Sequence, residues 1–470
     1  MYFYHVNYLD KLNEPQRAAV QQIEGPVMIV AGAGSGKTRV LTYRIAYMLE
    51  QGVDAFNILA LTFTNKASKE MRERIHSVVG NEARNLWMGT FHSIFARILR
   101  IESEKIGYPR NFTIYDTDDA KSLIKSIVAE MKLDDKVYKP AQILGRISAA
   151  KNALIKAAAY NQDAENSAND ESSGRPRLGA IYSAYEARCF KAGAMDFDDL
   201  LMKTHELLHN HPDVLNKYQH MFKYVMVDEF QDTNHAQYSI IRMLSNVYQN
   251  IAVVGDDAQS IYAFRGATIK NILNFHKDFP DTKVFKLEEN YRSTKTIVNA
   301  ANSIIKQNRD QIEKKVFTQN ESGDRIRVFR ALTDNEEGKM VASAIFQDKM
   351  NKHLNNKDFA ILYRTNAQSR SLEEALRKMN IPYKIFGGLS FYQRKEIKDL
   401  LAYFRVIINP NDEEALKRII NYPTRGIGKT TLDQLTILAS EHNKSWFEIM
   451  EVAHQYGLKS ANLLTDFTLM

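Results

Sequence analysis

The sequence has little cysteine and no long apolar segment. Cys189 is the only cysteine among the 470 residues, which excludes a disulfide within the chain, a zinc site built from several cysteines and an iron–sulfur cluster held by them. No apolar run approaches the roughly 20 residues that a membrane-spanning helix needs. The stretch MYFYHVNYLDKLN (1–13) lacks a basic region followed by an apolar segment, so we expect no secretory signal. These absences favour the reducing cytoplasm.

Neither sign of charge strongly dominates. The 63 Lys and Arg residues exceed the 56 Asp and Glu residues by a net charge of +7, which permits a polyanionic partner but does not indicate one. Hydrophobic residues make up 44% and charged residues 25%, as in ordinary soluble globular proteins. A length of 470 residues predicts about three or four domains.

A glycine-rich loop lies between a predicted strand and a predicted helix. The apolar stretch 27–30 leads into Gly32–Thr38 (GAGSGKT), and a helical pattern follows from Arg39 to Glu50. The glycines let backbone N–H groups turn inward, where phosphates would lie. We expect Lys37 to reach the β- and γ-phosphates and the Thr38 hydroxyl to ligate Mg²⁺. The strand–loop–helix context argues against a chance glycine-rich turn, so the sequence predicts binding of a nucleoside triphosphate.

A short predicted helix precedes this loop. Asn13 is suited to cap it, and Pro15 lies in its first turn, where proline is tolerated. The Gln16 amide can both donate to and accept from an adenine edge. A solvated glutamine would be the better explanation of Gln16 alone, so the adenine interpretation depends on its position just upstream of the loop.

Two adjacent carboxylates end another predicted strand. The apolar stretch 224–227 runs into Asp228 and Glu229. One carboxylate can hold Mg²⁺ through water, and its neighbour can orient and polarise an attacking water. A strand that ends in Asp-Glu is common by chance, but here it shares a chain with a phosphate loop. The pair therefore predicts hydrolysis of the bound triphosphate.

Polar and aromatic residues follow three more predicted strands. Open α/β sheets bind ligands at the carboxyl ends of their strands. Gln259 is placed to sense a γ-phosphate, whereas Tyr262, Phe264 and Arg265 offer stacking faces and a cation for a single-stranded nucleic acid. Phe264 as a core residue and His92 as a structural histidine are the alternatives. The three segments are FTNKA (63–67), MGTFHS (88–93) and DDAQSIYAFRGA (256–267).

Helical patterns replace the α/β rhythm in two regions. Residues 115–195 predict a helical insertion, whose scattered lysines suit a solvated face as well as a binding stripe, and 161–176 predict a mobile loop within it. A second α/β unit follows, with predicted strands at 326–330 and 359–363. The pattern turns helical again from about Gly387.

Taken together, these motifs resemble the UvrD/Rep family of superfamily 1 DNA helicases. They occur in the family's order and spacing over essentially the whole chain. The matching segments are Gln16, AGAGSGKT (31–38), FTNKA (63–67), GTFHS (89–93), DFDDLL (196–201), VDEFQDT (227–233), GDDAQSIYAFRGA (255–267) and ENYRS (289–293).

The resemblance implies an α/β fold of two RecA-like motor domains with parallel sheets, each carrying an inserted all-helical subdomain. The expected parts are 1–110 and 196–285 for the first motor domain, 111–195 for its insertion, 286–387 for the second motor domain and 388–470 for the second insertion.

The resemblance also implies roles for individual residues. ATP would contact Gln16, Ala31, Gly32, Ala33, Gly34, Ser35, Gly36, Lys37, Thr38, Arg39, Tyr291 and Arg292, with Tyr291 stacking on adenine and Arg292 reaching the γ-phosphate. Thr38 and Asp228 would hold Mg²⁺. The catalytic set would be Lys37, Asp228, Glu229, Gln259 and Arg292. Single-stranded DNA would contact Phe63, Thr64, Asn65, His92, Tyr262, Phe264, Arg265 and Arg364.

Two departures from the family pattern qualify this expectation. The family more often has tryptophan where this chain has Phe264, which offers a smaller stacking face. The last motor motifs, including a second γ-phosphate arginine, are not found before Met470, so we expect a C-terminally truncated chain. Arginines of that type are worth roughly 10³–10⁵ in turnover, which predicts impaired hydrolysis by this chain alone.

The resemblance implies an ATP-dependent helicase that moves 3′ to 5′ on single-stranded DNA and unwinds single-strand/duplex junctions. By the same resemblance, backbone N–H groups of Gly426-Ile427-Gly428 would grip duplex phosphates. The alternative is a nucleotide-gated DNA-binding module without unwinding activity. A small-molecule kinase would explain the phosphate loop but not the segment Gln259–Gly266.

Overall fold

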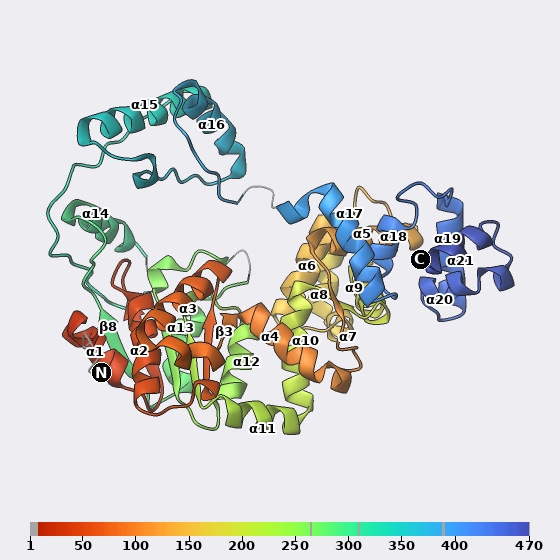
Figure 1. The fold of residues 1–470 in the computed structure, drawn as a ribbon, viewed down its shortest axis with the longest axis horizontal. Coiled ribbons are helices and arrows are strands. Elements are labelled where there is room, and N and C mark those ends of the chain that lie inside the picture. Colours follow the sequence, from red (N-terminus) through yellow and green to blue (C-terminus); the bar gives the residue numbers. More distant parts are fainter. Residues whose placement is uncertain (1–7, 264–265, 309–310, 388–390, 470) are drawn as a thin grey trace. The chain divides into compact units, whose positions relative to one another are not determined.

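The computed structural model describes residues 8–263, 266–308, 311–387 and 391–469 (Figure 1). The chain forms two compact units. Unit 1 comprises Met1–Glu321 and Asp399–Met470, and unit 2 comprises Ser322–Lys398. None of the helices in the described ranges is long and apolar enough to span a bilayer.

A six-stranded parallel sheet forms the centre of unit 1, in the order β3-β2-β6-β7-β1-β8. Its strands read as nearly continuous apolar runs because helices cover both faces of the sheet. The strands predicted at 27–30 and 224–227, and those predicted immediately before the segments 63–67 and 256–267, are confirmed. The bounds are β1 Val27–Ala31, β2 Ile58–Thr62, β3 Trp87–Thr90, β6 Tyr224–Val227, β7 Ile251–Gly255 and β8 Lys283–Leu287.

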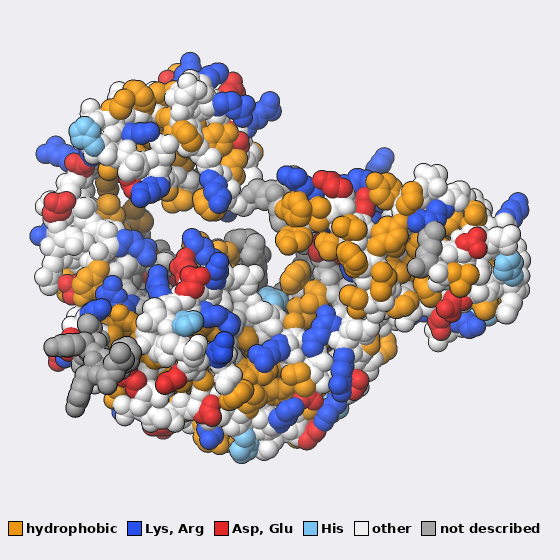
Figure 2. Space-filling model, in the orientation of Figure 1, with side chains coloured by type: hydrophobic (Ala, Val, Ile, Leu, Met, Phe, Trp, Pro, Cys, Tyr) orange, Lys and Arg blue, Asp and Glu red, His pale blue; other side chains and the backbone are white. Residues whose placement is uncertain are grey.

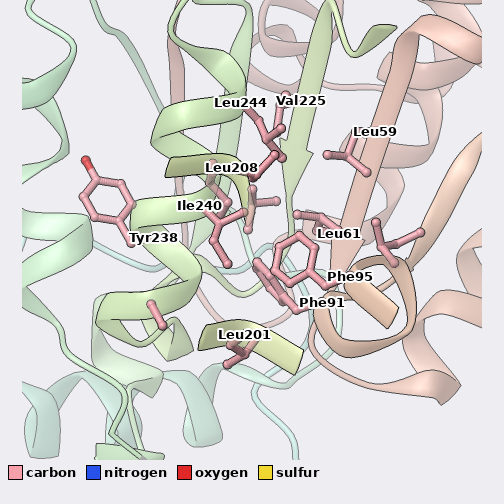
Figure 3. Packing of buried hydrophobic residues seen from close by; sticks show 14 of the residues in the cluster. Leu59, Leu61, Phe91, Phe95, Leu201, Leu208, Val225, Tyr238, Ile240 and Leu244 are labelled. Carbon is pink, nitrogen blue, oxygen red and sulfur yellow. The ribbon is translucent and has the colours of Figure 1, made fainter. Parts of the chain in front are cut away.

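Alternate residues of β1, β2, β3, β6 and β7 contribute to two separate cores. Met28 and Val30 of β1 join one core, and Val27, Ile29 and Ala31 join the other. The first core packs beneath α4, α10, α11, α12 and α13. Figure 3 shows its side chains from β2, β6, α4, α10 and α12. The second packs beneath α1, α2 and α3. The bounds are α1 Glu14–Gln21, α2 Lys37–Glu50, α3 Asn65–Val79, α4 Phe91–Glu102, α10 Phe197–Asn210, α11 Pro212–Met221, α12 His235–Ser245 and α13 Lys270–Asp278.

A helical bundle follows α4 and has its own core. The helical character predicted for 115–195 is confirmed, but the mobile loop predicted at 161–176 is wrong. Asp163 caps α8 by accepting from the N–H groups of Glu165 and Asn166, and buried Asp170 accepts from the Tyr160 hydroxyl at 3.0 Å. The elements are β4 Thr113–Ile114, α5 Thr117–Glu130, α6 Pro140–Asn152, α7 Ala157–Gln162, α8 Ala164–Ser172, α9 Leu178–Lys191 and β5 Ala194–Met195.

The C-terminal part of unit 1 is a second helical bundle with a separate core. It packs on the first bundle, where Arg405 Nη1 lies 2.8 Å from Asp119 Oδ2 and Asn409 Nδ2 donates to the Ala192 carbonyl at 2.9 Å. Hydrophobic side chains gather over α17, including Phe404 and Ile407 (Figure 2). The helices are α17 Lys395–Ile408, α18 Glu413–Ile419, α19 Lys429–Glu441, α20 Trp446–Glu451 and α21 Ala461–Thr468.

Unit 2 consists of α15 (Asp334–Lys352) packed on α16 (Ser369–Lys378), with extended segments around them. The strands predicted at 326–330 and 359–363 are wrong, because neither segment pairs with another strand among the described residues. Val328 is 90% exposed and Leu362 is 93% exposed. Without a partner for its backbone N–H and C=O groups, an apolar run does not form a sheet.

Candidate nucleotide and nucleic-acid site

The phosphate loop connects β1 to α2 through a tight left-handed path. Gly34 and Gly36 have φ angles of 69° and 87°, which favour glycine. A Cβ on Gly34 would lie 2.8 Å from both Arg292 Cβ and Asn290 Nδ2, so a side chain has no room there. Gly36 supplies no side-chain cap to α2, which leaves the first-turn N–H groups of a 14-residue helix available to an anion.

The two predicted carboxylates lie beside this loop. Lys37 Nζ is 2.8 Å from Glu229 Oε2, and the Lys37 side chain is 12% exposed. Glu229 follows β6 in a left-handed backbone conformation with φ 51°, which is unfavourable for a residue with a side chain. The fold holds this residue in that conformation next to the phosphate loop, so the lysine and the acidic pair share one site.

Asp228 is a buried carboxylate with an unusual titration. Burial first, and then the charge of Glu229, raise its pKa to about 7, while Lys37 acts in the opposite direction. A divalent cation at Asp228 would favour the ionised form, and the Thr38 hydroxyl lies next to Lys37 at the start of α2. In the described part of the chain no three His, Cys, Asp or Glu residues form a cage. One carboxylate and one hydroxyl suit Mg²⁺, which keeps waters and phosphate oxygens as further ligands.

A chain of hydrogen bonds runs from the carboxylates to Gln259. Gln231 Nε2 donates to Glu229 Oε2 at 2.9 Å, and Gln231 Oε1 accepts from the Asp256 N–H at 2.9 Å. Gln259 Nε2 donates to Asp256 Oδ2 at 2.6 Å. Gln231 is 1% exposed. The sequence alone did not predict its role, because Gln231 is one residue within the longer motif VDEFQDT (227–233). Its place two residues after Glu229 was the available signal.

Gln16 and Tyr291 meet at Asn13. Asn13 caps α1 and accepts from the Gln16 N–H, while Asn13 Nδ2 donates to the Tyr291 hydroxyl at 2.8 Å. Gln16 is 1% exposed, and its Nε2 donates to the Ser35 carbonyl at 2.9 Å, so it fastens the phosphate loop. The Tyr291 ring is 44% exposed, and partial burial with a hydrogen bond to Glu289 raises its pKa to about 12.

The segment after β8 is tied to the phosphate loop. Asn290 Nδ2 donates to the Ala33 carbonyl at 2.6 Å, and the Tyr291 N–H donates to the Gly34 carbonyl at 3.0 Å. Asn290 Oδ1 also accepts from the Arg292 N–H at 2.9 Å. Arg292 is exposed, and its Cβ stands over Gly34. The predicted cationic residue is therefore adjacent to the loop.

Two of the predicted stacking residues lie side by side. The Phe63 and Tyr262 rings, from the segments that follow β2 and β7, have centroids 5.0 Å apart and are both partly exposed. Thr64 Oγ1 caps α3 by accepting from the Ala67 N–H at 3.1 Å, and Asn65 begins that helix on the surface. The predicted residues Phe264 and Arg265 lie outside the described residues.

His92 packs against an aromatic residue that the sequence did not single out. Its ring centroid is 5.9 Å from that of Phe197, which is 51% exposed at the start of α10. Burial lowers the pKa of His92, so the imidazole is neutral at pH 7 and offers a hydrogen bond rather than a charge. Phe197 lies in DFDDLL, where an aromatic residue at the first helical position was the available signal. Arg364, in unit 2, is exposed.

Comparisons with known proteins match this chain to one family. Residues 12–280 match the UvrD/REP helicase N-terminal domain, and residues 285–464 match the UvrD-like helicase C-terminal domain. The chain belongs to the UvrD/REP helicase family.

Relatives of this UvrD/REP family member are similar over almost its whole length. It is 47% identical over 451 residues to the ATP-dependent DNA helicase PcrA of Staphylococcus aureus, which covers 96% of this chain and 61% of the relative. It is 46% identical over 464 residues to the ATP-dependent DNA helicase PcrA of Leuconostoc citreum, which covers 98% of this chain and 61% of the relative. The chain thus spans about three fifths of the length of these relatives.

In this family member the described site residues fall into two groups. The nucleotide group surrounds the loop Gly32–Gly36 and includes Lys37, Glu229 and Arg292. The aromatic group contains the touching pair Phe63 and Tyr262. The hydrogen-bonded chain through Gln231 ends at Gln259, three residues before Tyr262, and so links the two groups.

Proposed function

We propose that this chain is the ATP-binding part of a DNA helicase that couples ATP hydrolysis to 3′-to-5′ movement on single-stranded DNA and to unwinding at single-strand/duplex junctions in the cytoplasm. The observation that carries the proposal is the contact of 2.8 Å between Lys37 and Glu229. It joins a phosphate loop to a candidate base, and the Gln231–Asp256–Gln259 chain continues toward the stacking residues.

The residues of the nucleotide group have different roles. Lys37 binds the β- and γ-phosphates, Glu229 accepts a proton from the attacking water, and Arg292 neutralises charge on the γ-phosphate. Asp228 and Thr38 hold Mg²⁺, which supplies charge stabilisation to the phosphates when bound. Gln259 responds to the γ-phosphate. Tyr291 stacks on the base, and the Gln16 amide exchanges its contact with the Ser35 carbonyl for the adenine edge when the nucleotide binds. The remaining loop residues, Ala31 to Gly36, and Arg39 line the phosphates.

The aromatic group binds unpaired DNA. Phe63, Tyr262 and Phe264 stack on bases, whereas Thr64, Asn65, His92, Arg265 and Arg364 hold the backbone. Base–aromatic stacking is sequence-tolerant, which suits a protein that moves along DNA. Phe197 beside His92 adds a further exposed ring.

The domain boundaries form part of the proposal. Residues 1–110 and 196–285 belong to the first RecA-like motor domain, and 111–195 form its insertion. Residues 286–387 belong to the second motor domain, and 388–470 form part of its insertion. Because the chain spans 61% of its relatives, we expect it to bind ATP and single-stranded DNA weakly and to hydrolyse ATP slowly by itself.

A Lys37→Ala variant tests the nucleotide site. We expect it to lose binding of a fluorescent ATP analogue and all DNA-stimulated hydrolysis while its far-UV circular dichroism stays unchanged. Lys69→Ala is the matched control, since Lys69 is a surface residue of α3 whose side chain is 79% exposed. Undiminished binding and turnover in Lys37→Ala would refute the assignment.

A nucleotide-gated DNA-binding module without unwinding activity is the second candidate. Strand displacement from a duplex with a 3′ single-stranded tail separates the two functions. Nucleotide-dependent DNA binding with no strand displacement would favour the module.

A further inference from the structure

An extended segment, Gln311–Thr318, crosses the edge of the nucleotide site. We call it the strap. Its exposure alternates residue by residue: Ile312, Lys314 and Val316 are partly buried, whereas their neighbours Glu313, Lys315 and Phe317 are exposed. Alternation of this kind means that every second side chain faces the protein. The strap therefore has an inner face made of Ile312, Lys314, Val316 and the buried Thr318.

Lys314 is the charged residue on that face. Its Nζ lies 2.9 Å from Asp256 Oδ1 and also contacts Asp257, and its side chain is only 8% exposed. The Asp256 and Asp257 side chains are 3% and 0% exposed. The Ile312 N–H donates to Asp257 Oδ2 at 2.9 Å, which fixes the strap backbone next to the same pair. One buried ammonium thus serves two buried carboxylates.

The strap also touches the phosphate loop. A Cβ added to Gly32 would lie 2.6 Å from Val316 Cγ2, so Val316 covers this glycine. The Phe317 N–H donates to the Glu288 carbonyl at 3.0 Å, and the Asn290 N–H donates to the Phe317 carbonyl at 2.7 Å. Asn290 in turn holds Ala33. Val316 and Lys314 lie two residues apart on one face of the strap. Val316 contacts the phosphate loop, and Lys314 contacts the aspartate pair.

We propose that Lys314 is a positioning residue that sets Gln259 through Asp256. The two oxygens of the Asp256 carboxylate have different partners: Oδ1 binds Lys314 Nζ and also accepts from the Ala258 N–H at 3.1 Å, and Oδ2 accepts from Gln259 Nε2 at 2.6 Å. The two oxygens belong to one rigid carboxylate, so contacts that hold Oδ1 in place also hold Oδ2 in place. The Gln259 amide, which donates to Oδ2, is thereby held as well. This inference rests on the proposed role of Gln259 in sensing the γ-phosphate. It adds the strap as the element that holds the Gln259 side chain in its orientation.

Loss of the lysine would leave two buried carboxylates without their cation. A buried charge without its partner is costly, so Asp256 would turn toward other donors or toward water, and the Gln259 amide would follow it. Lys314 touches no substrate in this scheme. Its removal should therefore weaken discrimination between triphosphate and diphosphate more than it weakens binding of the diphosphate.

The test measures the dissociation constants of ADP and ATPγS for the 470-residue chain. We expect Lys314→Met to reduce the preference for ATPγS over ADP by roughly tenfold, because one hydrogen bond to a charged group contributes about that much. The dissociation constant of ADP should change less. Gln259→Ala should reduce the preference similarly, and adding Lys314→Met to it should have little further effect, because both changes disable the same contact. Lys314→Arg should restore most of the preference.

Matched variants separate positioning from folding. Lys315→Met removes the neighbouring exposed lysine and should leave the preference unchanged. Lys314→Met combined with Asp257→Asn keeps the net charge of the cluster and leaves one unpaired carboxylate instead of two, so it should recover part of the thermal stability lost by Lys314→Met while the preference stays low.

Each pattern of results decides the proposal. If Gln259→Ala reduces the preference but the folded Lys314 variants keep it, the strap inference is overturned and the proposed function stands. If Gln259→Ala itself leaves the preference unchanged, the sensing role fails and the inference fails with it. Additive effects of Lys314→Met and Gln259→Ala would also overturn it, because they would show that the two residues act separately.

Discussion

The sheet of unit 1 and the extended segments of unit 2 have similar sequences but adopt different structures. VMIVA (27–31) and FAILY (359–363) are both short apolar runs followed by a polar turn and a helix. In unit 1 the run is β1, with all five residues buried. In unit 2 Leu362 is 93% exposed and no strand forms. The comparison shows that an apolar run specifies a candidate strand, and that its partners decide whether the strand exists.

The partners of β1 come from distant parts of the chain. Val27 aligns with Ala252 of β7 and with Lys283 of β8, each more than 200 residues away along the sequence. The described segments of unit 2 have helices α15 and α16 on one side but no neighbouring strand. A cavity of about 840 Å³ lies beside 359–363 instead, lined by apolar residues such as Ile361, Leu376 and Ile381.

Hydrogen exchange should show the largest difference between the two regions. The amides of Ile29 and Val30 lie in paired strands, whereas those of Val328 and Leu362 have no strand partner. We expect the β1 amides to exchange at least about a thousandfold more slowly, since core strands open only by near-global unfolding. Mass spectrometry of peptic fragments measures this, and comparable protection at 326–330 would contradict the comparison.

Truncation of buried and exposed side chains should show the next largest effect. Ile29 is fully buried, so Ile29→Ala should lower the free energy of unfolding of unit 1 by about 2–5 kcal/mol. Leu362→Ala in unit 2 should change that free energy by less than about 0.5 kcal/mol. Both tryptophans, Trp87 and Trp446, belong to unit 1, so urea titration followed by tryptophan fluorescence reports the relevant transition. Equal losses would show that Leu362 is buried in solution.

Asp228 of the functional site should lower the free energy of unfolding of unit 1 by an amount that depends on pH. The pKa of Asp228 is raised to about 7, so between about pH 4 and pH 7 the folded state binds a proton that the unfolded state has released. Stability therefore falls as the pH rises through this window. Asp228→Asn should raise the free energy of unfolding by up to about 4 kcal/mol at pH 8 and by less at pH 5, because only the charged form is penalised.

The control for this prediction comes from unit 2. Asp324 is fully exposed there, and Asp324→Asn should leave the tryptophan-detected transition unchanged at both pH values. A constant gain from Asp228→Asn between pH 5 and pH 8 would mean that Asp228 stays ionised in the folded protein, in conflict with its raised pKa.

Helix caps should give the smallest effect and no difference between the regions. Thr90 caps α4 in unit 1 by accepting from the Ser93 N–H at 3.3 Å, and Thr333 caps α15 in unit 2 by accepting from the Glu336 N–H at 3.1 Å. Replacement of either threonine by alanine should cost about 1 kcal/mol, because a cap is a local interaction. Exchange of the first-turn amides of α4 and α15 measures both, and unequal effects would show that tertiary context acts on the caps.

Local patterns predicted the parts of the site that depend on neighbours in sequence. The loop before Lys37 and the acidic pair after β6 were recognisable because each lies at the end of a buried strand. The prediction at 161–176 was wrong because polar composition concealed a capped helix anchored by Asp170. Gln231, Phe197 and Lys314 were missed, since their partners Asp256, His92 and Asp257 are far from them or in another motif.

The sequence by itself determined the strand–loop–helix around Lys37, the order of the motifs and the membership of the UvrD/REP family, because each depends on residue types at short fixed spacings. Only the tertiary structure decided that Lys37 meets Glu229, that Lys314 lies against Asp256 and that 359–363 remains unpaired. The physical reason is that ion pairs, hydrogen-bonded chains and parallel strand pairing join residues that are tens to hundreds of positions apart, and chain topology brings such residues together.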